Sequence, residues 1–242
     1  MKYLVLLILS LKICLSFGQL DEQTSPSDSL QTKIKLSKVI VPISLISAGL
    51  LSTSSSFEKQ LQTKIRNNVG HNFECKIDNY LQYAPIIELY TADILGVKSK
   101  NHWFDQTKNL LIANAITAGI THSLKRINKP RPNGAEHSFP SGHTSFAFTN
   151  ASVLFHEFNK TAPLLAYSGF LFSSTTGVYR ILNNKHWFSD VVVGAGIGIL
   201  VTEIVYYFEP LKGFNPFINS KNLSFIPSIS NKNIGFYFSK RF

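Results

Sequence analysis

The amino-acid sequence predicts an all-α protein, a helical bundle of about six core helices followed by a short C-terminal β-hairpin. Three observations support this. Apolar stretches of helical length recur between residues 36 and 210. Hydrophobic residues make up 44 % of the 242 residues and charged residues only 16 %, which excludes disorder for most of the chain. Alternation with the period of a β-strand occurs only near the C-terminus.

The first 18 residues are typical of an export signal. Lys2 provides a charged start, residues 3–11 an apolar run, and residues 16–18 a small-x-small cleavage site. The alternatives are a lipoprotein anchor at Cys14 and a buried or membrane-anchoring N-terminal helix. Residues 19–35 are polar and are expected to form a linker. We therefore expect an exported protein of the bacterial periplasm or cell envelope.

Residues 36–210 are expected to form the helical domain. Its apolar stretches are residues 39–51, 77–97, 109–125, 144–158, 162–182 and 190–208. In the last stretch, Gly194, Gly196 and Gly198 would permit close helix packing. No stretch reaches the ~20 uncharged apolar residues that a bilayer span prefers, although 162–178 and 191–207 come close. The sequence leaves open whether this bundle is integral to the membrane or soluble in the periplasm.

Residues 211–242 are expected to form a C-terminal tail. Its segments "LSFIPSIS" and "IGFYFSKRF" flank "NKN" and alternate partly with a period of two. This pattern is typical of a β-hairpin.

The net charge points to anionic partners. The chain has 24 Lys and Arg against 14 Asp and Glu, a formal charge of +10. The basic residues are scattered and no nucleic-acid-binding motif is present, so a phosphorylated substrate and a membrane surface fit better than nucleic acid. Nothing indicates an obligate protein partner. No acidic or Cys/His cluster of metal-binding type is visible, so we expect neither a metal nor another cofactor.

Three stretches concentrate chemically active side chains: "LKRINKPRP" (124–132), "FPSGHTSF" (139–146) and "RILNNKHWFSD" (180–190). Taken singly, each has an ordinary structural explanation. The first resembles a solvated helix end, the second a turn in which Ser141 caps a helix, and the third a polar loop before a helix.

Taken together, the three stretches contain what oxyanion chemistry requires. Several cationic donors can converge on one anion, and backbone N–H groups at Gly142 and His143 can assist them. His186 and Asp190 are four residues apart, so the carboxylate can hold the Nδ1 proton and leave Nε2 free to attack. His143 can serve as a proton donor to the leaving oxygen.

The ordered set resembles the type 2 phosphatidic acid phosphatase and vanadium-haloperoxidase superfamily. The signatures of that superfamily are Lys-x6-Arg-Pro, Pro-Ser-Gly-His and Ser-Arg-x5-His-x3-Asp. The second is complete at residues 140–143, and the third has Arg180, His186 and Asp190 at full spacing, with Tyr179 where serine is usual. The resemblance covers about residues 77–208, with the signatures within 125–190.

The first signature departs from the family pattern. Counting back from Arg131, the lysine position is occupied by Leu124, and Lys125 follows one residue later. One residue rotates a helical side chain by roughly 100°. Either Lys125 or Lys129 therefore takes the lysine role, and we favour Lys125.

The resemblance implies a role for each matching residue. His186 would be the nucleophile that forms a phosphohistidine, and Asp190 would orient it. His143 would protonate the departing alkoxide and then activate water. The phosphoryl oxygens would be bound by Lys125, Arg131, Ser141, Gly142 and Arg180.

The resemblance thus predicts a metal-independent phosphatase acting on a phosphomonoester or diphosphate, with a phosphorylated lipid favoured over a small soluble ester. Two other hypotheses stay open. The same pocket can hold vanadate and act as a haloperoxidase, or it can bind a phospholipid without catalysis.

Overall fold

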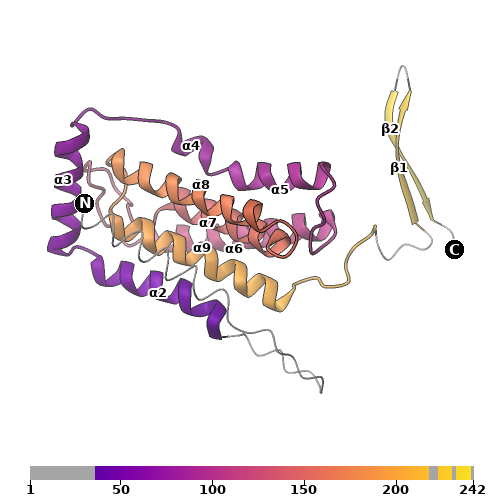
Figure 1. The fold of residues 1–242 in the computed structure, drawn as a ribbon, viewed down its shortest axis with the longest axis horizontal. Coiled ribbons are helices and arrows are strands. Elements are labelled where there is room, and N and C mark those ends of the chain that lie inside the picture. Colours follow the sequence, from indigo (N-terminus) through magenta and orange to yellow (C-terminus); the bar gives the residue numbers. More distant parts are fainter. Residues whose placement is uncertain (1–35, 218–222, 231–232, 241–242) are drawn as a thin grey trace.

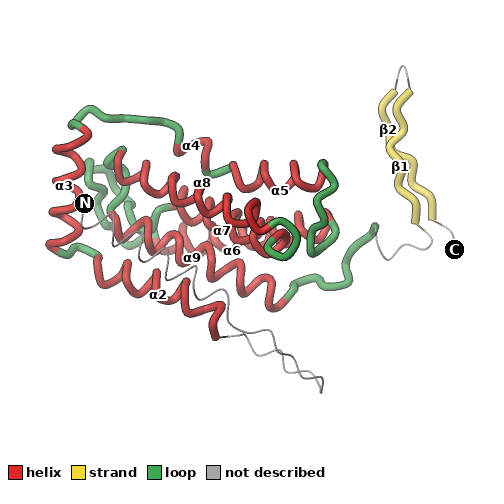
Figure 2. Tube along the Cα trace, in the orientation of Figure 1, coloured by secondary structure: helices red, strands yellow, loops and turns green. Residues whose placement is uncertain are grey.

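The computed structural model describes residues 36–217, 223–230 and 233–240. The expected export signal and linker therefore lie outside the described residues. Within these ranges the chain forms eight helices and one two-stranded sheet (Figures 1 and 2). They are α2 (Leu36–Ser52), α3 (Ser56–Val69), α4 (Asp78–Leu81), α5 (Ala84–Ile94), α6 (Trp103–Leu124), α7 (Gly142–Phe158), α8 (Pro163–Leu182), α9 (Phe188–Phe208), β1 (Leu223–Ser230) and β2 (Asn233–Lys240).

The structure confirms the predicted all-α bundle, and α7 and α9 form its centre. Helix α8 packs on α7, α2 packs on α9, α6 contacts both central helices, and α5 lies against α7 and α8 (Figure 1). The core side chains are mostly aliphatic and include Leu89, Leu110, Val153, Leu154, Val193 and Val201. The hairpin predicted near the C-terminus is also present, with β1 and β2 antiparallel.

Glycines on α9 set its distance from both neighbouring helices, as the sequence predicted. A Cβ at Gly194 would lie 2.8 Å from the carbonyl oxygen of Ser141, where α7 begins. A Cβ at Gly198 would lie 2.5 Å from the carbonyl oxygen of Ser145. Gly196 faces the other side, where a Cβ would meet α2 at the Pro42 carbonyl oxygen, 2.8 Å away. Small residues therefore let the backbones of α7 and α9 approach closely beside the first turn of α7.

Two parts of the sequence prediction need correction. Residues 77–97 are not one helix but two, α4 and α5, because Pro85 cannot donate a hydrogen bond to the carbonyl four residues earlier. Helix α3 was not expected, since its sequence is polar and contains no apolar run. It follows α2 at an angle of 86° and lies across one end of the bundle (Figure 1).

Many large apolar side chains face outward. Leu51, Ile94 and Leu164 are 85 %, 84 % and 88 % exposed, and Ile87, Leu111 and Leu171 are also exposed. Among the described helices, α9 has the length and apolar composition to cross a bilayer, and α2 with α3 qualifies only as a sharply bent pair. More than half of the apolar window in α9 is buried in the bundle, so this composition also suits a core helix.

Candidate active site

His186 lies in the short connection between α8 and α9, and its side chain is buried. Its backbone N–H donates to the Arg180 carbonyl oxygen (3.3 Å), which ties the connection to the last turn of α8. Its Nδ1 lies 3.6 Å from Oδ2 of Asp190. Catalytic hydrogen bonds are often this long when no substrate is bound. The predicted pairing of His186 with Asp190 is thus present as a close contact.

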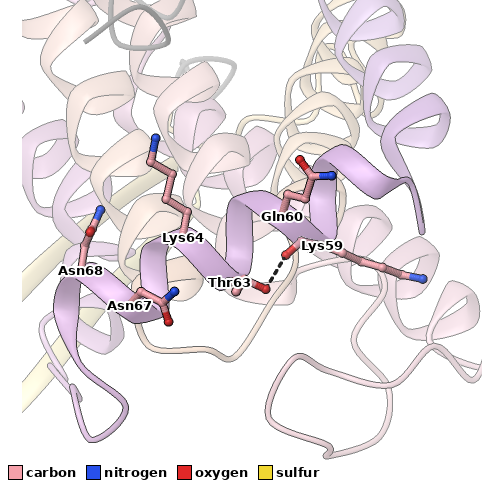
Figure 3. Close-up of a pocket in the computed structure, with 6 residues that line it drawn as sticks. All are labelled: Lys59, Gln60, Thr63, Lys64, Asn67 and Asn68. Atoms are coloured by element: carbon pink, nitrogen blue, oxygen red, sulfur yellow. Dashed lines mark hydrogen bonds between the residues drawn. The ribbon is translucent and has the colours of Figure 1, made fainter.

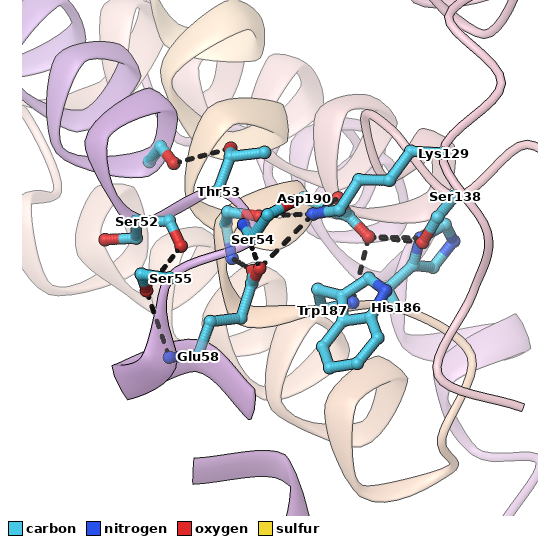
Figure 4. Close-up of polar contacts among 12 residues, drawn as sticks. Ser52, Thr53, Ser54, Ser55, Glu58, Lys129, Ser138, His186, Trp187 and Asp190 are labelled. Atoms are coloured by element: carbon cyan, nitrogen blue, oxygen red, sulfur yellow. Dashed lines mark hydrogen bonds and ion pairs between the residues drawn. The ribbon is translucent and has the colours of Figure 1, made fainter. Parts of the chain in front are cut away.

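Asp190 is in the first turn of α9, and other groups fix both of its carboxylate oxygens (Figure 4). Oδ2 accepts hydrogen bonds from the Trp187 backbone N–H (2.9 Å) and from the Ser138 hydroxyl. Oδ1 accepts one from the Lys129 ammonium (3.0 Å). The Trp187 bond is part of the capping of α9, so the start of this helix holds the carboxylate beside His186.

The second motif forms the turn that begins α7, and it contains a cis peptide bond between Phe139 and Pro140. The Ser141 hydroxyl caps α7, accepting from the Thr144 backbone N–H (3.4 Å) and lying 2.8 Å from the Thr144 hydroxyl. Gly142 is the first residue of the helix, and His143 the second. The N-terminal N–H groups of α7 and the His143 imidazole therefore belong to one helix turn.

Three cations surround these motifs. Lys125 follows the end of α6, and its ammonium donates to the carbonyl oxygens of His137 (3.0 Å) and Pro140 (3.2 Å). Nε of Arg131 donates to the Glu136 carbonyl oxygen (3.1 Å). Buried Arg180 lies in the last turn of α8, and its Nε has no partner among the described residues.

The pKa values show that the charges of these groups act on one another. Burial, and then the charge of Arg131, lower the pKa of Lys125. Burial, and then the charge of Arg180, lower the pKa of His143 to about 4, and His186 contributes in the same direction. For His186, burial lowers the pKa to about 4 and outweighs Asp190, which raises it. Both imidazoles are therefore neutral at pH 7 when the site holds no anion.

The surroundings of the two candidate lysines differ. The Lys129 ammonium contacts the Ser189 hydroxyl (2.8 Å), Asp190 and Glu58. The Lys125 side chain lies beside the turn of the second motif, since a Cβ on Gly142 would be 3.9 Å from its Cε. Lys125 is thus placed for an anion at this turn, whereas Lys129 is held by carboxylates.

Sequence reasoning missed three residues, because they come from α3 and α4. Buried Asp78 pairs with Arg180 (2.8 Å). The Asn79 side-chain oxygen lies 3.0 Å from Nε2 of His143. Buried Glu58 accepts a hydrogen bond from the Ser189 backbone N–H (2.9 Å). No local pattern marks them, since each acts through a contact more than 60 residues away along the chain.

A shallow polar groove lies on α3. It is lined by Lys59, Gln60, Thr63, Lys64, Asn67 and Asn68, all on one helix (Figure 3). None of these residues belongs to the three motifs. Among the described residues, no group of three or more Asp, Glu, His and Cys side chains is arranged to bind a metal.

The fold and the site together define a class of protein: a helical bundle in which paired histidines and three cations surround one helix N-terminus. Residues 100–214 match the model of the PAP2 superfamily. This segment of the chain is therefore similar to the PAP2 superfamily, in agreement with the resemblance of its motifs.

Two named proteins are similar to this chain in sequence. The chain is 35 % identical over 151 residues to a lipid A 1-phosphatase of Porphyromonas gingivalis, covering 61 % of this chain and 34 % of the relative. It is 29 % identical over 155 residues to a PA-phosphatase related-family protein of Dictyostelium discoideum, covering 59 % and 52 %. The chain thus spans between a third and about half of the length of these relatives.

A solved structure shares the fold. The PAP2-type phosphatidylglycerolphosphate phosphatase of Bacillus subtilis has a TM-score of 0.50 and 15 % identity, covering 73 % of this chain and 98 % of that chain. At this identity the likeness concerns the arrangement of the helices.

Proposed function

We propose that this protein is a PAP2-type phosphatase that removes a phosphate group from a phosphorylated lipid. One observation carries the proposal: His143 and His186, 43 residues apart in the sequence, both lie near Arg180, whose charge lowers the pKa of each imidazole. Two bases beside buried cations, within a segment similar to the PAP2 superfamily, suit phosphoryl transfer through an enzyme-bound intermediate.

In the first step, Nε2 of His186 attacks phosphorus while the bond to the lipid oxygen breaks. Asp190, beside Nδ1, favours the tautomer that leaves Nε2 unprotonated and stabilises the charge that develops on the ring. His143 gives its proton to the departing oxygen. Arg131, Arg180, Lys125 and the N-terminal N–H groups of α7 bind the phosphoryl oxygens; the Ser141 hydroxyl contributes mainly by capping α7.

In the second step, His143 accepts a proton from water, and the resulting hydroxide attacks the phosphohistidine. The P–N bond breaks, phosphate leaves and His186 is restored. The first step requires protonated His143, whose pKa is about 4 in the empty site. A bound phosphate dianion opposes the effect of Arg180 and raises the pKa of His143. Substrate binding therefore favours the protonated form of His143, which the first step requires.

A lipid substrate is supported by the surface of the bundle and by the relatives. The exposed apolar side chains suit a membrane surface. A lipid A 1-phosphatase and a phosphatidylglycerolphosphate phosphatase are among the similar proteins. We accordingly propose association with the bacterial cell envelope and a phosphorylated envelope lipid as substrate.

The test is phosphate release by the purified full chain from a panel of lipid and soluble phosphates, with EDTA present. We expect His186→Ala and His143→Ala to lose at least about 10³-fold in rate, in keeping with their roles as nucleophile and acid. Circular dichroism would verify that both variants fold. Full activity of both would refute the proposal, and halide oxidation with added vanadate and peroxide would favour a haloperoxidase instead.

A further inference from the structure

The first turn of α9 is supported from behind by a buried charged network that the three motifs do not include. Glu58 on α3 is 1 % exposed and Asp190 is fully buried. The Lys129 ammonium lies between them, 3.4 Å from Oε2 of Glu58 and 3.0 Å from Oδ1 of Asp190 (Figure 4). Two buried carboxylates this near one another would repel, so the lysine between them compensates both charges.

All three donors of the Lys129 ammonium have partners in this network. Besides the two carboxylates, the ammonium donates to the Ser189 hydroxyl (2.8 Å). Because an ammonium has three N–H groups, Lys129 has none left for a substrate phosphate. Its position therefore indicates a role behind the nucleophile and not in the anion site.

Glu58 joins the beginnings of two helices. Its Oε2 accepts from the Ser54 backbone N–H (2.8 Å), just before α3, and its Oε1 accepts from the Ser189 backbone N–H (2.9 Å), in the first turn of α9. Helix N-termini carry unpaired N–H groups and a partial positive charge, which a carboxylate satisfies. Glu58 thus fixes the turn of α9 that contains Asp190 to a helix outside the PAP2 match.

We propose that Glu58 and Lys129 are positioning residues for the His186–Asp190 pair. The proposal rests on the phosphatase function proposed above. Lys129 holds Oδ1 of Asp190, so Oδ2 stays toward His186, and Glu58 holds both Lys129 and the backbone of the same turn. With both oxygens engaged, the carboxylate cannot rotate away during turnover.

The charged groups around His186 come from every element packed there. They are Asp190 on α9, Arg180 on α8, Lys185 beside His186 in the chain, His143 on α7, Lys125, Lys129 and Arg131 between α6 and α7, Glu58 on α3 and Asp78 on α4. Lys129 and Glu58 carry opposite charges on the same side of Asp190. Removing the charge of Lys129 should therefore raise the pKa of His186, and removing the charge of Glu58 should lower it.

The test measures kcat, KM and the pH titration of His186 by NMR in Lys129→Met and Glu58→Gln. Lys129→Met removes a cation, so protonated His186 is stabilised and its pKa rises above about 4. Glu58→Gln leaves Lys129 uncompensated, so the pKa of His186 falls. We expect kcat to drop about 10- to 100-fold in both, as for groups that orient active-site ligands, with KM changed less than about twofold.

Matched controls are Glu209→Gln and Lys212→Met, which make the same charge changes at an ion pair after α9, where Lys212 is exposed and Glu209 half-buried. They should leave kcat and the His186 titration unchanged. Lys129→Arg keeps the charge and should retain the wild-type titration. Lys129→Gln, which also removes the charge, replaces Lys129→Met if that variant does not fold.

Three outcomes would overturn the proposal: shifts in the same direction for both variants, no shift in either, or a raised KM with unchanged kcat in Lys129→Met. The last would place Lys129 at the substrate. If the wild-type chain releases no phosphate, the proposed function fails, and the opposed titration shifts would still show whether the network acts on His186.

Discussion

The bundle contains two buried clusters of histidine and carboxylate, one at each end of α7, and they differ in how far their polar atoms are satisfied. The cluster near the start of α7 is the candidate active site. The cluster near its end, which we call the distal cluster, consists of His156, Glu157, Glu203 and Tyr206. Both contain an imidazole close to a carboxylate, so residue type alone does not distinguish them.

In the distal cluster, the carboxylates are engaged by donors. Glu157 accepts from the Tyr206 hydroxyl and from the Asn101 side chain (2.8 Å) through Oε1, and from the Asn101 backbone N–H (2.9 Å) through Oε2. His156 lies 2.9 Å from Glu203 and stacks on the Tyr206 ring. These bonds join the loop before α6 to α7 and α9, which is a structural role.

In the candidate active site, cations exceed the anions that face them, and a donor is left over. Nε of Arg180 is buried without a hydrogen-bond partner among the described residues, whereas Nδ1 of His186 faces Asp190 at 3.6 Å. Such a donor costs free energy unless a ligand satisfies it. The other buried side-chain atoms without a partner among the described residues are oxygens, on Glu88, Asp93, Gln106 and Asn114. An unpartnered cationic donor, more than the presence of histidine and carboxylate, therefore distinguishes the candidate active site from the distal cluster.

The largest expected effect is at Arg180. Arg180→Gln removes a buried cation from beside both histidines and takes away the ion-pair partner of Asp78. We expect kcat/KM to fall about 10³-fold, as when a group stabilising transition-state charge is removed. Steady-state kinetics on the preferred substrate would measure it.

Glu157→Gln in the distal cluster is the counterpart of Arg180→Gln in the candidate active site. It should lower the free energy of unfolding by about 1–3 kcal/mol, because a buried carboxylate that accepts from several donors is lost. The kcat/KM of the folded enzyme should stay within about twofold of the wild-type value. A large loss of kcat/KM without loss of stability would contradict the separation of the two clusters.

A smaller effect is expected at the glycines of α9. A Cβ at Gly194 in Gly194→Ala would clash with the Ser141 carbonyl oxygen, where α7 begins, whereas one at Gly196 in Gly196→Ala would clash with α2. Overpacking costs about 1–3 kcal/mol in both, but only Gly194→Ala should also lower kcat, by about tenfold. Thermal unfolding and steady-state kinetics of the two glycine variants would measure both effects. Equal kcat values for the two variants would argue against a link between the packing at Gly194 and the site.

The smallest effect is a shift in titration. The pKa of His143, about 4 in the free protein, should rise by at least one unit when vanadate occupies the site, because the anion offsets Arg180. NMR signals of the histidines would report this, and the His156 signal from the distal cluster should not respond. A His143 pKa unchanged by saturating vanadate would exclude it from the anion site.

Much of the site could be predicted because its motifs are local. Pro140, Ser141, Gly142 and His143 form one turn, and His186 and Asp190 are four residues apart, so short-range geometry already brings them together. Short-range geometry could not decide whether Lys125 takes the lysine role, because the direction of its side chain depends on the path of the chain after α6. Nor could Asn79 be found, since its contact with His143 joins residues 64 apart in the sequence.

By itself, the sequence determined the helical bundle, the order of its helices other than α3 and the break between α4 and α5, the motif residues and the close packing of α9. Hydrophobic periodicity, glycine and short spacings act locally. Only the tertiary structure decided that Lys129 lies between two carboxylates and that α3 and α4 supply Glu58, Asp78 and Asn79. The reason is physical: a buried charge takes whichever partner the fold brings within about 3–4 Å, and that choice depends on long-range packing.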